Sequence, residues 1–387
     1  MMLRVSASRR AGVSLRGAWF MRWGHFFAGV AALAVSVPAV AVPPVNRLTV
    51  PAGFHIAVYA DHVPSAREMA VGDDGTVFVG SMSAGSVYAL SPMDANGRAA
   101  VRVIARGLRM PVGVAFRKGD LYVSDTTRIV VLRDIEHHLD KPPEPEVVAD
   151  NLPYRAGDHS WKFIAFGPDD RLYVPIGAPC NICDVGHAFG KLISMKPDGT
   201  NLRDEAYGIR NTVGFTWQPG TENLWFTDNG RDMLGDDIPS DELNERTVAG
   251  QSFGYPYCHQ GNLPDPMFGR QHSCSEFVPP VVKLGAHVAA LGLRFYEGGM
   301  FPAAYRGGLL IAEHGSWNRS ELSGYQVVSV HFGADGKPEK PDVLVGGFRE
   351  GQDAWGRPAD VQPLPDGSVL ISDDTADAVY RLTYDGK

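Results

Sequence analysis

Residues 158–177 read DHSWKFIAFGPDDRLYVPIG, and this stretch decides the fold. From Phe163 to Ile176, residues suited to burial alternate on both sides of the tight turn GPDD. Such period-2 alternation on either side of a turn predicts a β-hairpin. His159 stands just before the first predicted strand. The hairpin pattern recurs along the chain, whereas the histidine does not.

Five more segments share the layout of strand, tight polar turn, strand, polar loop and further strand. They span residues 69–90, 113–132, 214–228, 292–330 and 360–382. Six copies of one unit predict a repeat architecture, and a unit of short antiparallel strands is typical of a propeller blade. We therefore expect an all-β fold, a six-bladed β-propeller. The alternative is an open β-sandwich or two smaller β domains.

The predicted sixth blade lies at the C-terminus and shows only three strands. A strand over residues 54–60 can supply the fourth and close the ring, which removes an open sheet edge. Two stretches break the even spacing of the blades, near residues 229–282 and 315–326. Long loops on a rigid scaffold commonly carry the binding site. We expect one propeller domain over residues 42–387 with these two loop insertions.

The N-terminal 41 residues have the features of an export signal. Arginines precede an apolar run at residues 26–35, and Ala39-Val40-Ala41 follows as a small-residue cleavage site. This pattern predicts a cleaved signal peptide over residues 1–41 and a periplasmic or secreted protein. Arg9-Arg10 leaves twin-arginine export as an alternative route. No other run is long and apolar enough to span a bilayer, so no stable membrane insertion is expected.

The charge of the chain argues against polyanionic partners. The formal net charge is -8 over 387 residues. No basic tract follows the predicted signal, which disfavours nucleic acid and anionic membrane surfaces as partners.

The four cysteines all lie in the predicted mature chain. An even number of cysteines in an exported protein favours disulfides, and we expect the pairs Cys180–Cys183 and Cys258–Cys274. Redox or metal chemistry at the CxxC motif is the alternative, although one such motif without a second ligand pair is weak evidence for zinc.

Polar residues stand directly before the predicted innermost strands of blades three and four. His159 occupies this place in blade three, and Arg210-Asn211 occupies it in blade four. Positions before the inner strands of a propeller converge on one end of its channel. A base, a guanidinium and an amide would then face one cavity, which suits proton abstraction from an alcohol. Taken alone, His159 could equally be a capping or solvated histidine.

The loop over residues 226–245 is dense in carboxylates and glycine. Oxygen ligands at this density suggest calcium, although the ordered alternation of an EF-hand loop is missing. The alternative is a solvated acidic loop.

Two later segments add cations at corresponding ring positions, Arg319 in blade five and Arg357 before the inner strand of blade six. Each alone could be a surface salt-bridge partner. Together they suggest a clamp for a planar ligand with several negative charges.

These segments resemble the soluble quinoprotein sugar dehydrogenases, the glucose/sorbosone dehydrogenase family, which use pyrroloquinoline quinone (PQQ). The resemblance covers about residues 48–384. It is carried by His159 ahead of FGPD, by GIRN at 208–211 and by DELN at 241–244. The segments APCNICD, FTDNGRD and GYPYC, beginning at residues 178, 226 and 254, resemble the sorbosone-dehydrogenase-like branch.

The resemblance implies the six-bladed propeller and a set of roles. His159 matches the general base that takes the hydroxyl proton while a hydride passes to the quinone. Arg210 and Asn211 match the pair that contacts the quinone oxygens, and Arg357 matches one of two arginines that bind the PQQ carboxylates. The main-chain carbonyls of Gly230 and Arg231 match those that hold Ca²⁺.

The chain departs from the family pattern at three positions, two of which bind the cofactor in the family. Ala359 stands where the second arginine is expected. The lysine of blade five has no counterpart, and Arg319 or His314 is its candidate replacement. The segment 108–111 has no match for a glutamine near the second blade.

The sequence thus predicts a periplasmic PQQ- and Ca²⁺-dependent dehydrogenase of an aldose or an aldosone such as sorbosone. Because the CxxC motif continues with Asp184 and binds no haem, electrons would pass to a separate acceptor, a cytochrome or a quinone. Two alternatives stay open. One is a calcium-dependent propeller lactonase, and the other is a non-catalytic binding propeller.

Overall fold

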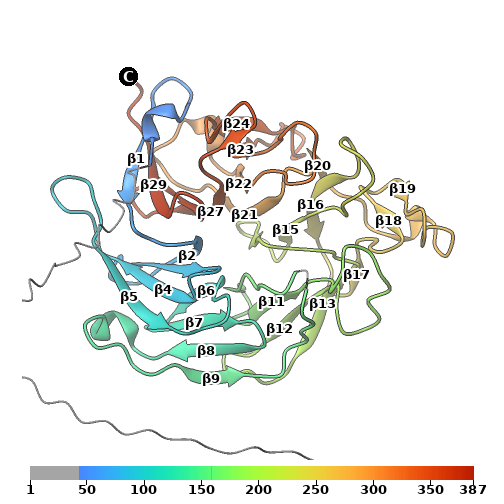
Figure 1. Cartoon of the computed structure of the whole chain (residues 1–387), viewed down its shortest axis with the longest axis horizontal. Coiled ribbons are helices and arrows are strands. Elements are labelled where there is room, and N and C mark those ends of the chain that lie inside the picture. Colours follow the sequence, from blue (N-terminus) through green and yellow to red (C-terminus); the bar gives the residue numbers. More distant parts are fainter. Residues whose placement is uncertain (1–42, 158) are drawn as a thin grey trace, which may run out of the picture. The chain divides into compact units, whose positions relative to one another are not determined.

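The computed structural model describes residues 43–157 and 159–387, which form a ring of six β-sheets around a central channel (Figure 1). Each blade is a meander of four antiparallel strands running from the channel outwards, and the sheet of blade three gains a fifth strand at its outer edge. The innermost strands are β2, β6, β10, β14, β21 and β27, and neighbouring inner strands contact one another from β10 through β6, β2, β27 and β21 to β14. The prediction of an all-β, six-bladed propeller is confirmed.

Blade one consists of β2 (Ala66–Val71), β3 (Val77–Ser81), β4 (Ser86–Leu90) and β5 (Val101–Arg106). Blade two consists of β6 (Val114–Arg117), β7 (Asp120–Asp125), β8 (Arg128–Leu132) and β9 (Glu146–Ala149). Blade three consists of β10 (Ala165–Phe166), β11 (Leu172–Ile176), β12 (Lys191–Met195) and β13 (Arg203–Tyr207).

Blade four consists of β14 (Phe215–Trp217), β15 (Leu224–Asp228), β16 (Ser240–Arg246) and β20 (Val282–Ala286). Blade five consists of β21 (Ala290–Phe295), β22 (Leu309–Glu313), β23 (Gln326–Val330) and β24 (Asp342–Val345). Blade six consists of β27 (Pro358–Pro363), β28 (Val369–Asp373), β29 (Ala378–Tyr384) and β1 (Phe54–Ala60).

The ring closes through the strand that precedes the first blade. β1 pairs antiparallel with β29, so that Phe54 lies opposite Tyr384 and Val58 lies opposite Tyr380. The two ends of the described chain therefore share one sheet, as the sequence predicts. This pairing covers an edge that would otherwise leave backbone groups unpaired.

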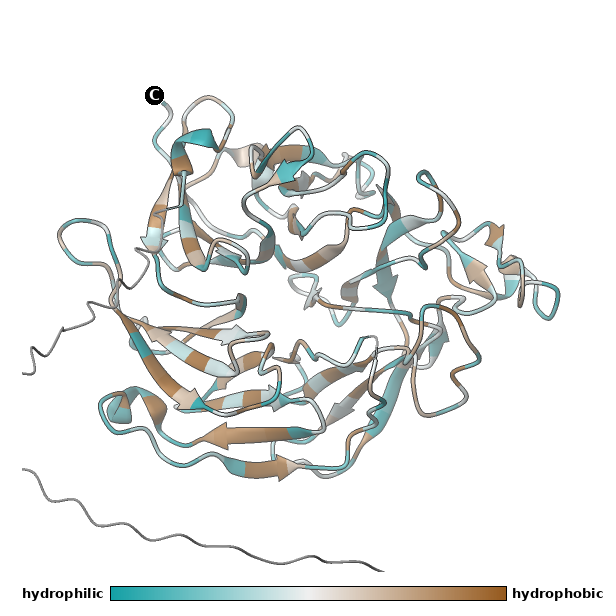
Figure 2. Ribbon diagram, viewed as in Figure 1, coloured by the Kyte–Doolittle hydropathy of each residue, from teal (hydrophilic) through white to brown (hydrophobic). Residues whose placement is uncertain are grey.

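Alternating side chains of each strand pack towards opposite neighbouring blades. In β3, Val77 and Val79 pack against blade six, whereas Phe78 packs against blade two. This follows from the period of two in a strand, and it explains why the repeated hairpins are apolar on both faces. Among the described residues, six buried clusters lie one between each pair of adjacent blades. In Figure 2 the brown, hydrophobic positions accordingly lie along the strands and the teal positions along many of the loops.

The loop between β16 and β20 forms a projection at the edge of the ring (Figure 1). It contains the short strands β17 (Gln251–Ser252), β18 (Cys258–His259) and β19 (Leu263–Pro264) and the 3₁₀ turn η3 (Cys274–Glu276). β17 pairs in parallel with β13, so this loop of blade four adds a fifth strand to blade three. The sequence prediction does not include this pairing.

The remaining short elements are η1 (Val45–Arg47), η2 (Ile135–His138), η4 (Ala303–Tyr305), β25 (Arg349–Glu350) and β26 (Asp353–Ala354). None of the helices in the described chain has the length and apolar character needed to cross a membrane. The expected signal peptide over residues 1–41 lies outside the described residues.

Candidate functional site

A cavity of about 440 Å³ opens at one end of the channel. All six blades or the loops between them contribute to its lining, which contains several arginines, histidines and asparagines. The lining residues include His159, Trp161, Asn181, Arg210, Asn211, Asn229, Gly230, Asp232, Met233, Asp241, His287, His314, Trp317, Asn318, Arg67 and Arg357. Among the described residues, three guanidinium groups and two carboxylates face this space, so their charge suits an anionic ligand.

His159 is buried, with 8% of its surface exposed, and its imidazole has a defined tautomer. Its Nδ1 lies 2.7 Å from the carbonyl oxygen of Ala178, and because a carbonyl can only accept, Nδ1 carries the proton. Nε2 is then an unprotonated acceptor, and it bonds to no residue that the structure describes. Burial, followed by the nearby charge of Arg210, lowers the pKa of His159 to about 3. The side chain is therefore a neutral base at physiological pH.

The backbone holds this imidazole in an unusual conformation. His159 has φ 54°, in the left-handed region that side chains other than glycine seldom adopt. Gly177 lies against it, and a Cβ at position 177 would come within 2.6 Å of the His159 Cβ. A side chain at position 177 would displace the histidine. Local strain of this kind is commonly found at functional sites.

Arg210 and Asn211 meet the cavity from the turn before β14. The carboxylate of Asp228, at the end of β15, accepts hydrogen bonds from the main-chain N–H groups of both residues, at 2.9 and 2.6 Å. The Asn211 side chain donates to Oδ1 of Asn229 at 3.2 Å. Asp228 thus fixes the turn that presents the guanidinium and the amide to the same cavity as His159.

Arg357 and Arg67 bring two more cations to the cavity, from the start of β27 and from β2. Arg357 donates to the carbonyl oxygens of His314 and Gly315, at 3.0 and 2.6 Å. Arg67 forms an ion pair with Asp374 at 2.8 Å, while its buried Nε has no partner in the described structure. Arg67 is an addition to the sequence-based set, and its strand β2 contacts β27, the strand that carries Ala359.

His314 also lines this cavity. Its Nε2 lies 2.8 Å from the Asp374 carboxylate, which holds Arg67 with its other oxygen. Burial nevertheless lowers the pKa of His314 to about 4, against the opposing influence of Asp374. The side chain is neutral at physiological pH and leaves the positive charge of this region to the arginines.

The loop over residues 229–232 contains the proposed metal residues. Asp241 of β16 accepts from the N–H of Gly230 at 2.8 Å and from the N–H of Ala289 at 2.6 Å. The carbonyl oxygens of Gly230 and Arg231 accept no hydrogen bond from the described residues. Two uncommitted carbonyl oxygens are suitable ligands for a hard cation such as Ca²⁺.

A cluster of side-chain ligands is the other arrangement that could hold a metal ion. Within residues 43–157 and 159–387, no group of three or more His, Cys, Asp or Glu side chains is arranged to hold a metal ion. The main-chain oxygens of Gly230 and Arg231 remain the candidate calcium ligands.

Arg319 does not line the cavity. Its guanidinium donates to the carbonyl oxygens of Glu321 and Asp236 and lies 3.5 Å from the Asp237 carboxylate. The side chain therefore ties the 315–326 loop to the 229–282 loop instead of reaching a cofactor. Its neighbours Trp317 and Asn318 do line the cavity, and 67% of the Trp317 surface is exposed.

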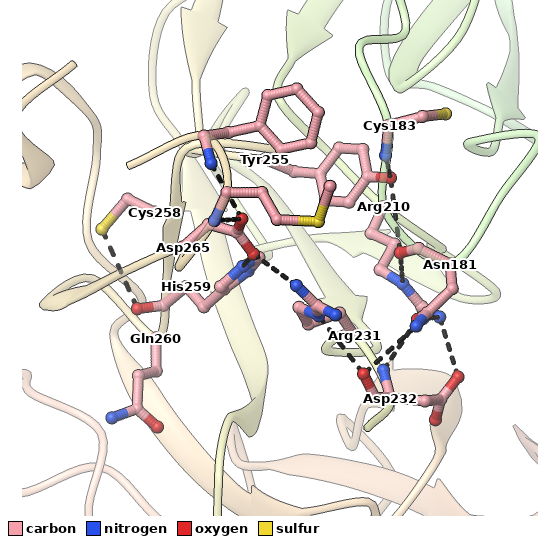
Figure 3. Close-up of polar contacts among 12 residues, drawn as sticks. Asn181, Cys183, Arg210, Arg231, Asp232, Tyr255, Cys258, His259, Gln260 and Asp265 are labelled. Carbon is pink, nitrogen blue, oxygen red and sulfur yellow. Dashed lines mark hydrogen bonds and ion pairs between the residues drawn. The ribbon is translucent and has the colours of Figure 1, made fainter. Parts of the chain in front are cut away.

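Both expected disulfides are present, Cys180–Cys183 and Cys258–Cys274. The described chain contains no free cysteine. The Cys180–Cys183 bridge closes a loop whose Asn181 lines the cavity. The Cys258–Cys274 bridge closes a loop whose Asp265 forms an ion pair with Arg231 (Figure 3).

Sequence reasoning missed Arg67 and Asn181 as parts of the site. Asp232 and Asp241 lie in the 226–245 loop that the sequence suggested for calcium, but their contacts were not predicted. Arg67 had a visible signal, because Arg67-Glu68 places two charges in an otherwise apolar inner strand. Asn181 and Asp232 lie in loops whose meeting depends on three-dimensional folding.

Comparisons with known proteins agree with this architecture. A protein of Borreliella burgdorferi of unknown function is 30% identical over 353 residues, covering 88% of this chain and 92% of that protein. The calcium structure of a Trichoderma reesei carbohydrate-active enzyme of family AA12 is 19% identical with a TM-score of 0.73, and the likeness covers 87% of this chain and 97% of that one.

The holo form of the PQQ domain of a Coprinopsis cinerea pyranose dehydrogenase is 17% identical with a TM-score of 0.72, over 87% of this chain and 97% of that one. These structural likenesses show a shared fold. A family model described as TrAA12-like matches residues 184–383, more than half of the sequence. The chain belongs to the TrAA12-like family.

Proposed function

We propose that the protein is a PQQ- and Ca²⁺-dependent dehydrogenase that oxidises an aldose or an aldosone such as sorbosone. The observation that carries this proposal is the neutral, tautomerically defined His159 in one cavity with Arg210, Arg67 and Arg357. A free base beside several cations suits the removal of a proton from a sugar hydroxyl next to a polyanionic cofactor.

The cavity fits the charge of PQQ, which carries three carboxylates. Arg67 and Arg357 are placed to bind carboxylates, and each retains N–H groups that the protein does not use. The buried Nε of Arg67 and Nε1 of Trp161 have no partner in the described structure. Because unpaired buried donors are costly, a ligand acceptor here would stabilise the site. Arg210 and Asn211 would contact the quinone oxygens.

Calcium would bind to the carbonyl oxygens of Gly230 and Arg231. Asp241 holds the Gly230 N–H and keeps this loop in place. Because Ca²⁺ takes six to eight oxygen ligands, the remaining ligands would come from the cofactor and water.

In the proposed reaction PQQ supplies the acceptor for a hydride from the sugar carbon. His159 Nε2 takes the proton from the hydroxyl on that carbon, and Nδ1 remains bonded to the Ala178 carbonyl, which holds the ring in orientation. The positive charge of Arg210 stabilises negative charge that develops nearby. Electrons then leave to a separate acceptor, a cytochrome or a quinone.

Solved structures with the same fold support this assignment. One is a PQQ domain of a pyranose dehydrogenase, and another is a PQQ-bound aldose sugar dehydrogenase of Streptomyces coelicolor. The two disulfides and the predicted signal peptide support a place in the periplasm or outside the cell.

The direct test is a titration of the purified protein with PQQ, with and without CaCl₂, followed by absorbance. Saturable binding that requires Ca²⁺, and that brings dye reduction with aldoses or sorbosone, supports the proposal. If PQQ does not bind under either condition, the proposal is wrong.

A further inference from the structure

We propose that Asn181, in the loop closed by the Cys180–Cys183 disulfide, is a positioning residue that fixes the Arg210 guanidinium against the 229–232 loop. The inference rests on the proposed function only where it assigns Arg210 to the cofactor. The positioning itself is a property of the protein without ligands.

Asn181 makes this contact with its main-chain oxygen and with both polar atoms of its side chain (Figure 3). Its main-chain oxygen accepts from Arg210 Nε at 2.9 Å, and its Oδ1 accepts from Arg210 Nη2 at 2.8 Å. The same Oδ1 accepts from the N–H of Asp232 at 2.8 Å, and Nδ2 donates to the Asp232 carbonyl at 3.1 Å. One residue therefore binds both the guanidinium and the main chain next to Arg231.

The loop that carries Asn181 is itself held on both sides. The disulfide joins the residues directly before it and two places after it. The Tyr255 hydroxyl accepts from the N–H of Cys183 at 3.2 Å and lies 3.4 Å from the Asn181 carbonyl oxygen. A short covalent loop restricts the conformations open to Asn181, so its hydrogen bonds require little further ordering.

Arg210 needs such support because its side chain is long and buried, with only 5% of its surface exposed. Its other contacts are the Asn229 carbonyl at 3.1 Å and the Asp232 carboxylate at 3.0 Å. Asp232 is in turn held by Asn181 and by Asn318, whose Nδ2 donates to Oδ1 at 3.0 Å. Removing Asn181 would thus loosen Arg210 directly and also through Asp232.

The position of Arg210 also affects the base. The positive charge of Arg210 disfavours protonation of His159, and this effect adds to that of burial. If Arg210 moves away, the pKa of His159 rises. Asn181→Ala neither adds nor removes a charge. The other titratable and charged groups of the described lining are Arg67, Arg357, Asp232, Asp241, His287 and His314.

The test compares wild type with Asn181→Ala, Asn181→Asp and the matched control Asn223→Ala. Asn223 lies in the β14–β15 turn, where its side chain donates to Glu245 at 2.7 Å, away from the cavity. The ligand-free proteins are labelled with ¹⁵N, and the Arg210 side-chain N–H signals are recorded. Wild type and Asn223→Ala should show separate, slowly exchanging Arg210 signals. Asn181→Ala should average them, and Asn181→Asp should retain them because it keeps the acceptor oxygen.

The kinetic arm uses PQQ, CaCl₂ and an aldose that wild type oxidises. Asn181→Ala should lower kcat by up to about 100-fold, as expected for a misplaced group, with little change in KM. The acid limb of its kcat/KM profile should move to higher pH. A merely structural role would lower thermal stability without moving this limb.

The outcomes are separable. If wild type shows no oxidation, the proposed function fails, and the ligand-free spectra still decide the role of Asn181. Unchanged Arg210 signals in a folded Asn181→Ala protein would overturn the inference.

Discussion

Arg231 and Asp265 form a buried ion pair, with 2.7 Å between Nη1 and Oδ2. His259 Nε2 lies 3.0 Å from the same carboxylate oxygen, and the N–H groups of Met267 and Phe268 bind the other. Figure 3 shows Asp265 with His259 and Arg231. Asp265 and His259 belong to the projection that the Cys258–Cys274 disulfide closes. The projection is thereby attached to the residue whose carbonyl is proposed to bind calcium.

Asp265→Asn should weaken calcium binding. Burial raises the pKa of Asp265, but the hydrogen bonds from His259 and Arg231 outweigh this effect and hold the pKa below its usual value, so the group is a carboxylate at neutral pH. Its loss leaves the Arg231 guanidinium without its anion and loosens the loop. Outer contacts to a metal site are worth about 10–100-fold in affinity, and calorimetry with CaCl₂ in the presence of PQQ measures this. The exposed pair of His55 with Asp385 offers Asp385→Asn as the control, and equal affinity in both variants would contradict the account.

His159→Ala should lower kcat by about 100-fold to 10,000-fold, because it removes a general base. PQQ should still bind, since the arginines are intact. Steady-state dye reduction and a PQQ titration measure the two effects separately. Loss of both together, or of neither, would argue against the assigned role.

The pH profile of wild type follows from the lowered pKa of His159, which is about 3. The active form of the base is neutral, and it stays neutral as the pH falls through 6.5, the usual value for histidine. In the range where the protein is folded, kcat/KM should therefore not decline with an apparent pKa near 6.5. A decline at that pH that His159→Gln abolishes would contradict the structural environment described for this imidazole.

Arg67→Met should weaken PQQ binding by about 10-fold to 100-fold, because a hydrogen bond to a charged group contributes about 1.5–3 kcal/mol. Arg357→Met should have a similar effect, since both groups are proposed to bind carboxylates. The control is Arg98→Met, which removes a partly exposed arginine paired with Asp61 outside the cavity. If the PQQ affinity of Arg67→Met and Arg357→Met changes as little as that of Arg98→Met, neither arginine binds the cofactor.

Trp317→Ala should raise the KM for the sugar. The indole is exposed at the cavity and lies on a loop tied down by Asn318 and Arg319, so it presents an ordered apolar face to a sugar ring. Aromatic contacts of this kind contribute about 0.5–1.5 kcal/mol, which is a few-fold to about tenfold in KM with kcat unchanged. Met267→Ala is the control, because Met267 is equally exposed, at 68%, and does not line the cavity. A KM that both variants leave unchanged would place the sugar elsewhere.

The fold could be read from the sequence because each hairpin carries its own signal. Buried residues alternate on both sides of turns such as GPDD at 167–170, and the partner of the 54–60 strand follows from the three-stranded last repeat. The convergence of His159, Arg210 and Arg357 was also predictable, since all three stand before inner strands.

The rest of the site depends on contacts between loops. Arg67 lies within an inner strand and not before one, so the rule that selected His159, Arg210 and Arg357 did not select it, although the charged pair Arg67-Glu68 is a local signal. Arg319 was expected at the cofactor, but the carbonyl oxygens of Asp236 and Glu321 bind its guanidinium. Asn181 reaches Arg210 because the disulfide loop meets the turn before β14, and no local pattern encodes this contact.

The most direct test of the central claim is dye reduction by the purified protein with PQQ and CaCl₂ added singly and together, over a panel of aldoses and sorbosone. The account predicts sugar oxidation only when both are present, and its loss in His159→Ala with PQQ still bound. Oxidation without PQQ, or no oxidation despite PQQ bound with Ca²⁺ across the panel, would contradict it.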